Sequence, residues 1–299
     1  MTKPSSFVTK VDVALADKMK QDLTEQGFQL TRPAHTLFSA KKTGVSCTLY
    51  QSGKLLVQGK DMGTFIEFYL EPQILKDFSY THQETLVDTT PRIGCDEAGK
   101  GDFFGHLTAA AVYADQGGIQ ELIKMGVKDS KSMNDTTILS LGRKIEKNFP
   151  CHIVAIGPEK YNEIYPKFGN LNQLLAWAHA SCIEQLVAKT HCREVIIDQF
   201  AYESVMENAV RRKKLELQMT QRTKGEGDVV VAAASIVARK NFVEKLEALE
   251  RKYEVSLPKG GSSPKVIRAG KHFIAKYGVE KLGLVGKLHF KTKDSIILP

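Results

Sequence analysis

The chain has 299 residues, of which 42% are hydrophobic and 25% charged, and its formal net charge at pH 7 is +8. This composition is typical of a globular protein with one large or two ordinary domains. The sequence contains no run of about 18 apolar residues, so we expect no membrane span. The N-terminus lacks an apolar signal core and the five cysteines form no C-x-x-C pair, so we expect a cytoplasmic protein with reduced thiols.

The first part of the chain has the pattern of a small α+β domain. In chain order we expect a helix over 12–26 that Gly27 ends, strands near 35–41, 44–50 and 55–57, and a helix over 61–76. We assign this domain to residues 1–77. Residues 78–91 are polar, contain a proline and show no period, so we expect a linker there.

The remaining residues, 92–299, alternate strand-like and helix-like segments. We expect strands ending at 96–97 and over 107–113, 152–156 and 194–198, and helices over 134–148, 172–189 and 229–253. This alternation predicts a mixed α/β sheet with helices packed on it.

Two adjacent carboxylates, Asp96 and Glu97, follow an apolar run and directly precede the turn Gly99-Lys100-Gly101. Adjacent acids repel each other, and a divalent cation would neutralise them. The turn offers backbone N–H groups and one cation, which suits a phosphate or a ribose. Together they indicate a metal beside a phosphodiester.

The same stretch is close to a nucleotide-binding phosphate loop. Gly94 to Gly101 reads G-x-x-x-x-G-K-G, whereas the loop requires serine or threonine at its last position. Gly101 has no hydroxyl for magnesium, and Asp96 and Glu97 would repel the bound phosphates. The pattern therefore argues against a nucleotide hydrolase.

Further acids are candidates for the same site. Asp198 ends the apolar run Val195-Ile196-Ile197, and the carboxyl end of a buried strand faces the crevice where α/β sheets bind ligands. Glu226 and Asp228 precede a helix rich in alanine, and the choice between them stays open. Oxygen ligands alone favour a hard cation such as magnesium.

The positive charge gathers at the C-terminal end. Residues 258–299 hold nine lysines and arginines but only two acids, which accounts for nearly all of the net charge. A basic tail on an otherwise balanced chain indicates a polyanionic partner; a solvated basic face is the alternative.

Several motifs together resemble the type 2 ribonucleases H, which cleave RNA in RNA–DNA hybrids. They are Asp96-Glu97-Ala98-Gly99-Lys100-Gly101, Lys128-Asp129-Ser130-Lys131, Asn170-Leu171-Asn172, Ile197-Asp198-Gln199-Phe200, the Ala-Ala-Ala-Ser-Ile segment at 232–236, and Lys287-Leu288-His289-Phe290. The lysine in the first motif and the Asp-Gln-Phe sequence are similar to the ribonuclease HIII branch.

The resemblance implies a ribonuclease H-like mixed sheet flanked by helices, with an N-terminal α+β domain similar to the TATA-binding-protein fold that helps to hold substrate. It implies a metal-binding and catalytic tetrad of Asp96, Glu97, Asp198 and Glu226. In the family, the distance of the fourth acid from the alanine-rich helix corresponds to Gly225 in this sequence. A one-residue deletion in the intervening loop would bring Glu226 to that place. The turn Gly99, Lys100 and Gly101 would read the ribose 2′-hydroxyl.

The other expected substrate contacts are Asp129, Ser130, Lys131, Asn170, Asn172 and His179; for His179 a core or surface histidine without a contact to nucleic acid is the alternative. The implied activity is endonucleolytic cleavage of the RNA strand of a hybrid by two magnesium or manganese ions. The products would carry 5′-phosphate and 3′-hydroxyl ends. We expect a monomer that binds hybrid nucleic acid and no membrane. A non-catalytic hybrid- or duplex-binding protein is the competing hypothesis.

Overall fold

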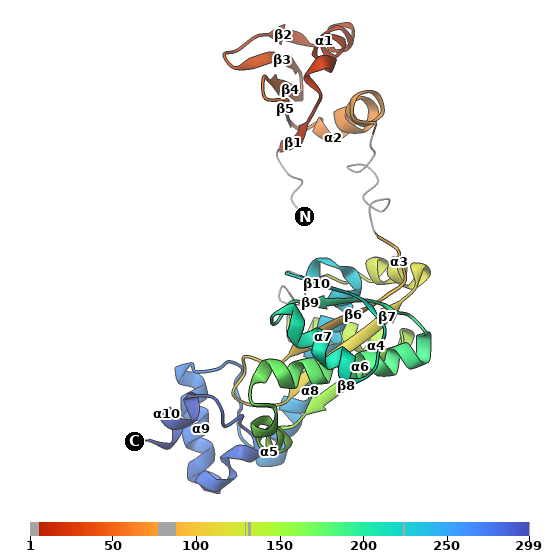
Figure 1. Cartoon of the computed structure of the whole chain (residues 1–299). Helices are drawn as coiled ribbons and strands as arrows, with labels where there is room; N and C mark the ends of the chain where they lie inside the picture. Colours follow the sequence, from red (N-terminus) through yellow and green to blue (C-terminus); the bar gives the residue numbers. More distant parts are fainter. Residues whose placement is uncertain (1–5, 77–87, 129, 131–132, 224, 299) are drawn as a thin grey trace. The chain divides into compact units, whose positions relative to one another are not determined.

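The structure, a computed structural model, describes residues 6–76, 88–128, 130, 133–223 and 225–298. The chain divides into two compact units, Met1–Asp88 and Thr89–Pro299, which are drawn in Figure 1. No helix within the described ranges is both long and apolar enough to span a membrane.

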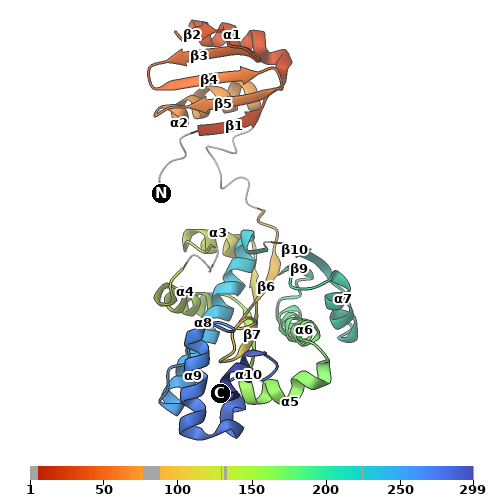
Figure 2. The same ribbon diagram turned by 90° about the vertical axis from the view of Figure 1, so that its left-hand side faces the viewer.

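The N-terminal unit is an antiparallel sheet with helices on one face. Its strand order is β1 (Ser6–Lys10), β5 (Lys54–Gln58), β4 (Val45–Tyr50), β3 (Thr36–Lys42) and β2 (Gln29–Thr31). Helix α1 (Ala16–Glu25) and helix α2 (Met62–Phe65), which continues as the π-helix Ile66–Leu75, lie on the same side of this sheet (Figure 2). No helix formed by the described residues 6–76 lies on the other face of the sheet.

Alternation along the strands explains why one face is covered. Leu55 and Val57 are fully buried in the core, whereas Lys54 and Gln58 at the two ends of β5 are exposed and Leu56 between Leu55 and Val57 is half-buried, as the two-residue period of a strand requires. The expected helices and the three inner strands are present. Strands β1 and β2 were not anticipated, because β2 has three residues and β1 is half polar, which leaves little periodic signal.

The second unit is built on a mixed five-stranded sheet in the order β10–β9–β6–β7–β8. Its strands are β6 (Arg92–Ala98), β7 (Leu107–Ala114), β8 (Cys151–Ile156), β9 (Glu194–Asp198) and β10 (Gln218–Arg222). Strands β10, β9 and β6 run parallel, and β7 is antiparallel to both of its neighbours. The mixed α/β sheet predicted from the alternation is thus confirmed.

Helices cover both faces of this sheet, as Figure 2 shows. On one side lie α6 (Leu171–Thr190) and α7 (Glu203–Arg212); on the other lie α8 (Val229–Tyr253), α4 (Asp135–Asn148) and α3 (Gln116–Lys124). Helix α8 packs closely on β6 because its first turns consist of small residues opposite a glycine. A Cβ atom at Gly94 would lie 2.4 Å from the backbone of Val230 and Val231, so only glycine fits.

The basic C-terminal segment is folded, which corrects the expectation of a tail. It forms α9 (Pro264–Tyr277), a short 3₁₀ helix (Val279–Leu284) and α10 (Thr292–Ile297). Phe273, Leu282 and Val285 are buried in one cluster with Phe103 and Phe242. The positive charges of this segment therefore project from a packed helical unit. Helices α3, α5 (Pro158–Phe168) and α7 and strand β10 were not predicted either.

Candidate active site

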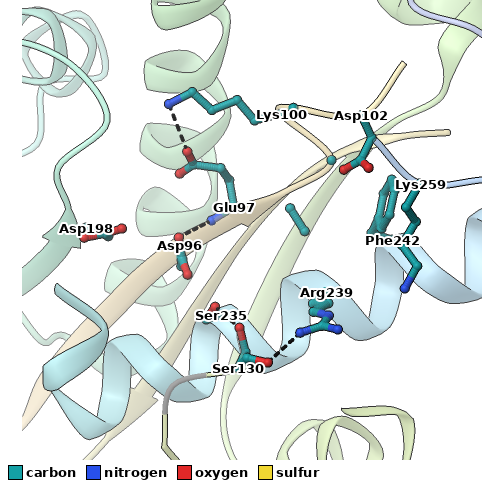
Figure 3. Close-up of a pocket in the computed structure, with 13 residues that line it drawn as sticks. Asp96, Glu97, Lys100, Asp102, Ser130, Asp198, Ser235, Arg239, Phe242 and Lys259 are labelled. Carbon is teal, nitrogen blue, oxygen red and sulfur yellow. Dashed lines mark hydrogen bonds and ion pairs between the residues drawn. The ribbon is translucent and has the colours of Figure 1, made fainter. Parts of the chain in front are cut away.

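The ends of two neighbouring parallel strands place acidic side chains together. Cys95 of β6 pairs with Ile197 of β9, so the next residues along the two strands, Asp96 and Asp198, lie at the same edge, where the pairing of β6 with β9 ends. These two acids and Glu97 line one pocket of about 400 Å³ (Figure 3). Its other lining residues are Ala98, Gly99, Lys100, Gly101, Asp102, Ser130, Ser235, Arg239, Phe242 and Lys259.

Asp96 is a buried carboxylate among other negative charges. Burial, together with the nearby charges of Glu97 and Asp198, raises its pKa to about 7. A hydrogen bond from Ser235 and one from the backbone N–H of Glu97, which donates to Oδ1 at 2.8 Å, offset part of this. Since like charges and desolvation both disfavour the ionised form, a cation would be bound favourably here.

Glu97 is held on both of its oxygens. Lys100 Nζ lies 3.3 Å from Oε1 and His179 Nε2 lies 3.1 Å from Oε2. Burial would raise the pKa of Glu97, but the hydrogen bond and charge of His179 and the ammonium of Lys100 outweigh it and lower the pKa. His179 itself is fully buried, which places it in the core, and its expected contact with substrate stays a prediction.

Asp198 is fixed by the loop that carries the candidate fourth acid. The backbone N–H of Gly225 donates to Asp198 Oδ1 at 2.7 Å. A Cβ atom at position 225 would lie 2.8 Å from Asp198 Cα. The glycine that occupies the expected fourth-ligand spacing thus has a steric role, because it lets the loop approach the end of β9.

Asp228 has a structural role next to this loop. Its Oδ1 accepts the N–H groups of Val230 and Val231 at the start of α8, and its Oδ2 lies 2.8 Å from Nε of Arg92. Both side chains of this ion pair are buried. Asp228 does not line the pocket of the other acids. Glu226 lies in the short 3₁₀ turn Gly225–Gly227, and its side chain lies outside what the structure describes.

The turn after Glu97 depends on one of its two glycines. Gly99 has φ +81°, and a Cβ atom there would lie 2.1 Å from the carbonyl oxygen of His106. Around the Cβ position of Gly101, by contrast, the described atoms leave 4 Å of open space. Gly99 therefore shapes the turn, and the backbone at Gly101 is accessible from the pocket side.

The pocket is also lined by hydroxyls and cations, and of these residues on α8 and the neighbouring loops the sequence analysis predicted only Ser130. Ser130 is buried and its hydroxyl lies 2.8 Å from that of Ser235. Arg239, four residues after Ser235 on α8, donates to the Ser130 carbonyl and pairs with Asp135. Lys259 pairs with the same Asp135. The i, i+4 spacing of Ser235 and Arg239 on one helix was the available sequence signal.

Two of the remaining expected substrate contacts, Asn170 and Asn172, lie outside the pocket. Asn170 caps α6 by accepting the N–H of Gln173 at 3.0 Å, and both Asn170 and Asn172 are exposed. Neither lines the pocket. Asp129 and Lys131 lie outside the described residues.

The acids of the pocket suit a hard divalent cation, although the described side chains do not form a closed cage. Among them no three His, Cys, Asp or Glu residues gather closely enough to form a ready metal site, and Glu226 is not among those side chains. Asp96, Glu97 and Asp198 nevertheless supply oxygen ligands at one edge, and burial and repulsion by the other two acids destabilise the charge of Asp96. This donor set fits magnesium or manganese.

Comparisons with known proteins agree with this geometry. A family model described as Ribonuclease HII matches residues 93–293, and one described as a domain of unknown function (DUF3378) matches residues 6–81. The chain is 52% identical over 297 residues to Ribonuclease HIII of Protochlamydia amoebophila (99% of this chain, 98% of the relative). It is 45% identical over 296 residues to that of Chlamydia pneumoniae, covering 98% of both chains.

Solved structures give the same result. The crystal structure of Bst-RNase HIII in complex with Mn²⁺ matches with a TM-score of 0.68 at 29% identity, covering 98% of both chains. That of Aquifex aeolicus RNase H3 matches with a TM-score of 0.57 at 25% identity, covering 95% of this chain and all of that one.

Proposed function

Because this chain belongs to the ribonuclease HII family, and to the ribonuclease HIII enzymes within it, we propose that it hydrolyses the RNA strand of RNA–DNA hybrids at the pocket of Asp96, Glu97 and Asp198. The position of these three acids on the wall of one pocket is the observation that carries the proposal. A protein that only bound nucleic acid would gain nothing from carboxylates beside a polyanion.

Asp96, Glu97, Asp198 and Glu226 would hold two divalent cations, magnesium or manganese. When bound, such ions lower the pKa of water and offset the negative charge on the attacking and leaving oxygens of an in-line displacement. The carboxylates set the position of that chemistry. Expulsion of the 3′-oxygen would leave a 3′-hydroxyl and a 5′-phosphate.

Incubation of the purified protein with labelled RNA–DNA hybrid, double-stranded RNA and double-stranded DNA, with and without magnesium or manganese, tests this function. We expect cleavage of the RNA strand of the hybrid only, and only with a divalent cation. The new ends are then analysed for a 5′-phosphate. Tight hybrid binding without cleavage under every condition would favour the non-catalytic alternative.

The turn after Glu97 is proposed to recognise the ribose 2′-hydroxyl. Its backbone lies beside the carboxylates, and Gly101 leaves that backbone accessible. A hydroxyl that is both donor and acceptor distinguishes RNA from DNA. Close approach by backbone requires a residue without a side chain at this point.

The two glycines form a matched pair for a test. Gly99→Ala should lower the free energy of unfolding by about 2–4 kcal/mol, because of its positive φ and the clash with His106. Gly101→Ala should change it by less than about 0.5 kcal/mol. It should instead weaken hybrid binding by about tenfold or more, since overpacking costs about 1–3 kcal/mol. Urea unfolding and hybrid titration measure both; normal hybrid affinity in Gly101→Ala would contradict the assignment.

The N-terminal domain, residues 1–77 with 78–91 as a linker to 92–299, is proposed to hold the hybrid. On the sheet face opposite its helices, the exposed Lys10 lies opposite the exposed Lys54, and the hydroxyl of Thr48 bonds to that of the buried Ser39. A chain lacking residues 1–88 should bind hybrid much more weakly and still cleave it when a divalent cation is present. Unchanged hybrid affinity of the truncated chain would contradict this role.

Helix α9 offers phosphate contacts on the catalytic unit. Lys265, Arg268 and Lys271 lie on its exposed side, opposite the buried Val266 and Phe273, and form no ion pair within the described residues. Cations that neutralise phosphates release counterions on binding, so affinity falls with salt. These three side chains are therefore proposed to bind the backbone of either strand without regard to sequence.

The triple variant Lys265→Ala/Arg268→Ala/Lys271→Ala should flatten the slope of log affinity against log salt. Each lost phosphate contact should change the slope by roughly 0.7–0.9. Cleavage at saturating substrate should change little, because the three residues do not line the carboxylate pocket. A slope equal to that of the unmodified protein would mean that the exposed face of α9 is only solvated.

A further inference from the structure

We propose that His179 is a positioning residue for Glu97, and that the two oxygens of this carboxylate have different functions. Oε2 is permanently held by His179, whereas Oε1 exchanges its partner, Lys100, for a divalent cation. This inference rests on the proposed function, because it takes Glu97 as a metal ligand.

His179 is built into the interior as a fixed donor. Its side chain is 0% exposed, and its ring stacks on Phe200 with the centroids 5.1 Å apart and the planes at 21°. A carboxylate can only accept a hydrogen bond, so Nε2, 3.1 Å from Glu97 Oε2, carries the proton. Nδ1 has no hydrogen-bond partner among the described residues. The contact with Glu97 is thus the polar interaction that this buried ring makes.

Lys100 is the opposite kind of partner. Its side chain is 36% exposed, and its ammonium lies 3.3 Å from Oε1 and 5.5 Å from the centre of the Phe200 ring. A flexible, hydrated ammonium can leave such a contact readily. Lys100 also lines the pocket with Asp96 and Asp198, and Figure 3 shows its ammonium next to the Glu97 carboxylate.

The difference between the two partners decides which oxygen a cation can take. A donor locked by packing and by a ring stack keeps the carboxylate from rotating, as outer-shell donors do for metal ligands elsewhere. When no metal is bound, the ammonium of Lys100 neutralises Glu97. It then competes with an incoming cation for this carboxylate. Removing His179 and removing Lys100 should therefore change metal affinity in opposite directions, whereas two merely structural residues would not do so.

Calorimetric titration of Mn²⁺ into the full chain without nucleic acid tests the proposal, and circular dichroism checks the fold of each variant. His179→Asn and His179→Gln are the matched pair, because only glutamine places an amide N–H where Nε2 lies. His179→Asn should weaken Mn²⁺ binding by about 10–100-fold, and His179→Gln should retain it within a few-fold. Equal affinities of the unmodified protein and His179→Asn would overturn the proposal.

Lys100→Met provides the second readout and remains decisive if the His179 variants do not fold. It should tighten Mn²⁺ binding by about three- to tenfold, since a competing charge is lost. Weaker binding in Lys100→Met would overturn the division between the two oxygens. If the unmodified protein binds no Mn²⁺, the proposed metal site fails as well. If it binds Mn²⁺ and the variants behave alike, only the role of His179 and Lys100 fails.

Discussion

Asp198→Asn should abolish hybrid cleavage, with a loss of about 10³–10⁴-fold in kcat, while hybrid affinity stays within a few-fold. Asn and Asp have the same shape, and the amide oxygen can still accept the N–H of Gly225 that now binds Asp198 Oδ1. The variant therefore keeps the end of β9 and its loop in place. It loses the negative charge with which Asp198 is proposed to bind metal. Asp96→Asn should behave in the same way.

Single-turnover cleavage with Mg²⁺ and a separate measurement of hybrid binding in its absence distinguish chemistry from binding. Asp102→Asn is the control, because Asp102 lines the same pocket and accepts the N–H of Gly260, which asparagine can also do. This variant should cleave at a rate within a few-fold of the unmodified protein. Full cleavage by Asp198→Asn at ordinary magnesium would remove Asp198 from the metal ligands.

Glu226→Gln and Asp228→Asn should separate activity from stability. We expect Glu226→Gln to lower kcat by about 10³-fold or more with little change in the free energy of unfolding. Asp228→Asn should retain most activity but lower that free energy by about 3 kcal/mol or more, because it removes the negative charge from the buried ion pair with Arg92. Asparagine still caps α8, so the loss reports mainly on the ion pair.

Cleavage assays and urea unfolding of the two variants, side by side, provide the measurement. Each variant is the control for the other, since both exchange a carboxylate for an amide of equal size within three residues. If Asp228→Asn loses the activity and Glu226→Gln retains it, Asp228 is the fourth ligand and the loop register that favours Glu226 is wrong.

Signals that lie close together in the sequence were sufficient for the outline of the catalytic unit. Apolar runs that end on Asp96 and Asp198 are local, and parallel strands necessarily bring such ends to one sheet edge. The alanines of α8 likewise predict close packing on the sheet. Short or half-polar elements such as β2 and β10 escaped detection, because they contain too few periodic residues.

By itself, then, the sequence determined the mixed sheet, the family and the acids proposed as metal ligands, since each depends on residue types at fixed spacing. Only the tertiary structure decided what the neighbouring side chains do. Arg92 and Asp228 are 136 positions apart and His179 and Glu97 are 82 apart, and no local pattern encodes such contacts. Whether a histidine is buried or a basic segment is folded depends on what packs against it, and that is a property of the whole chain.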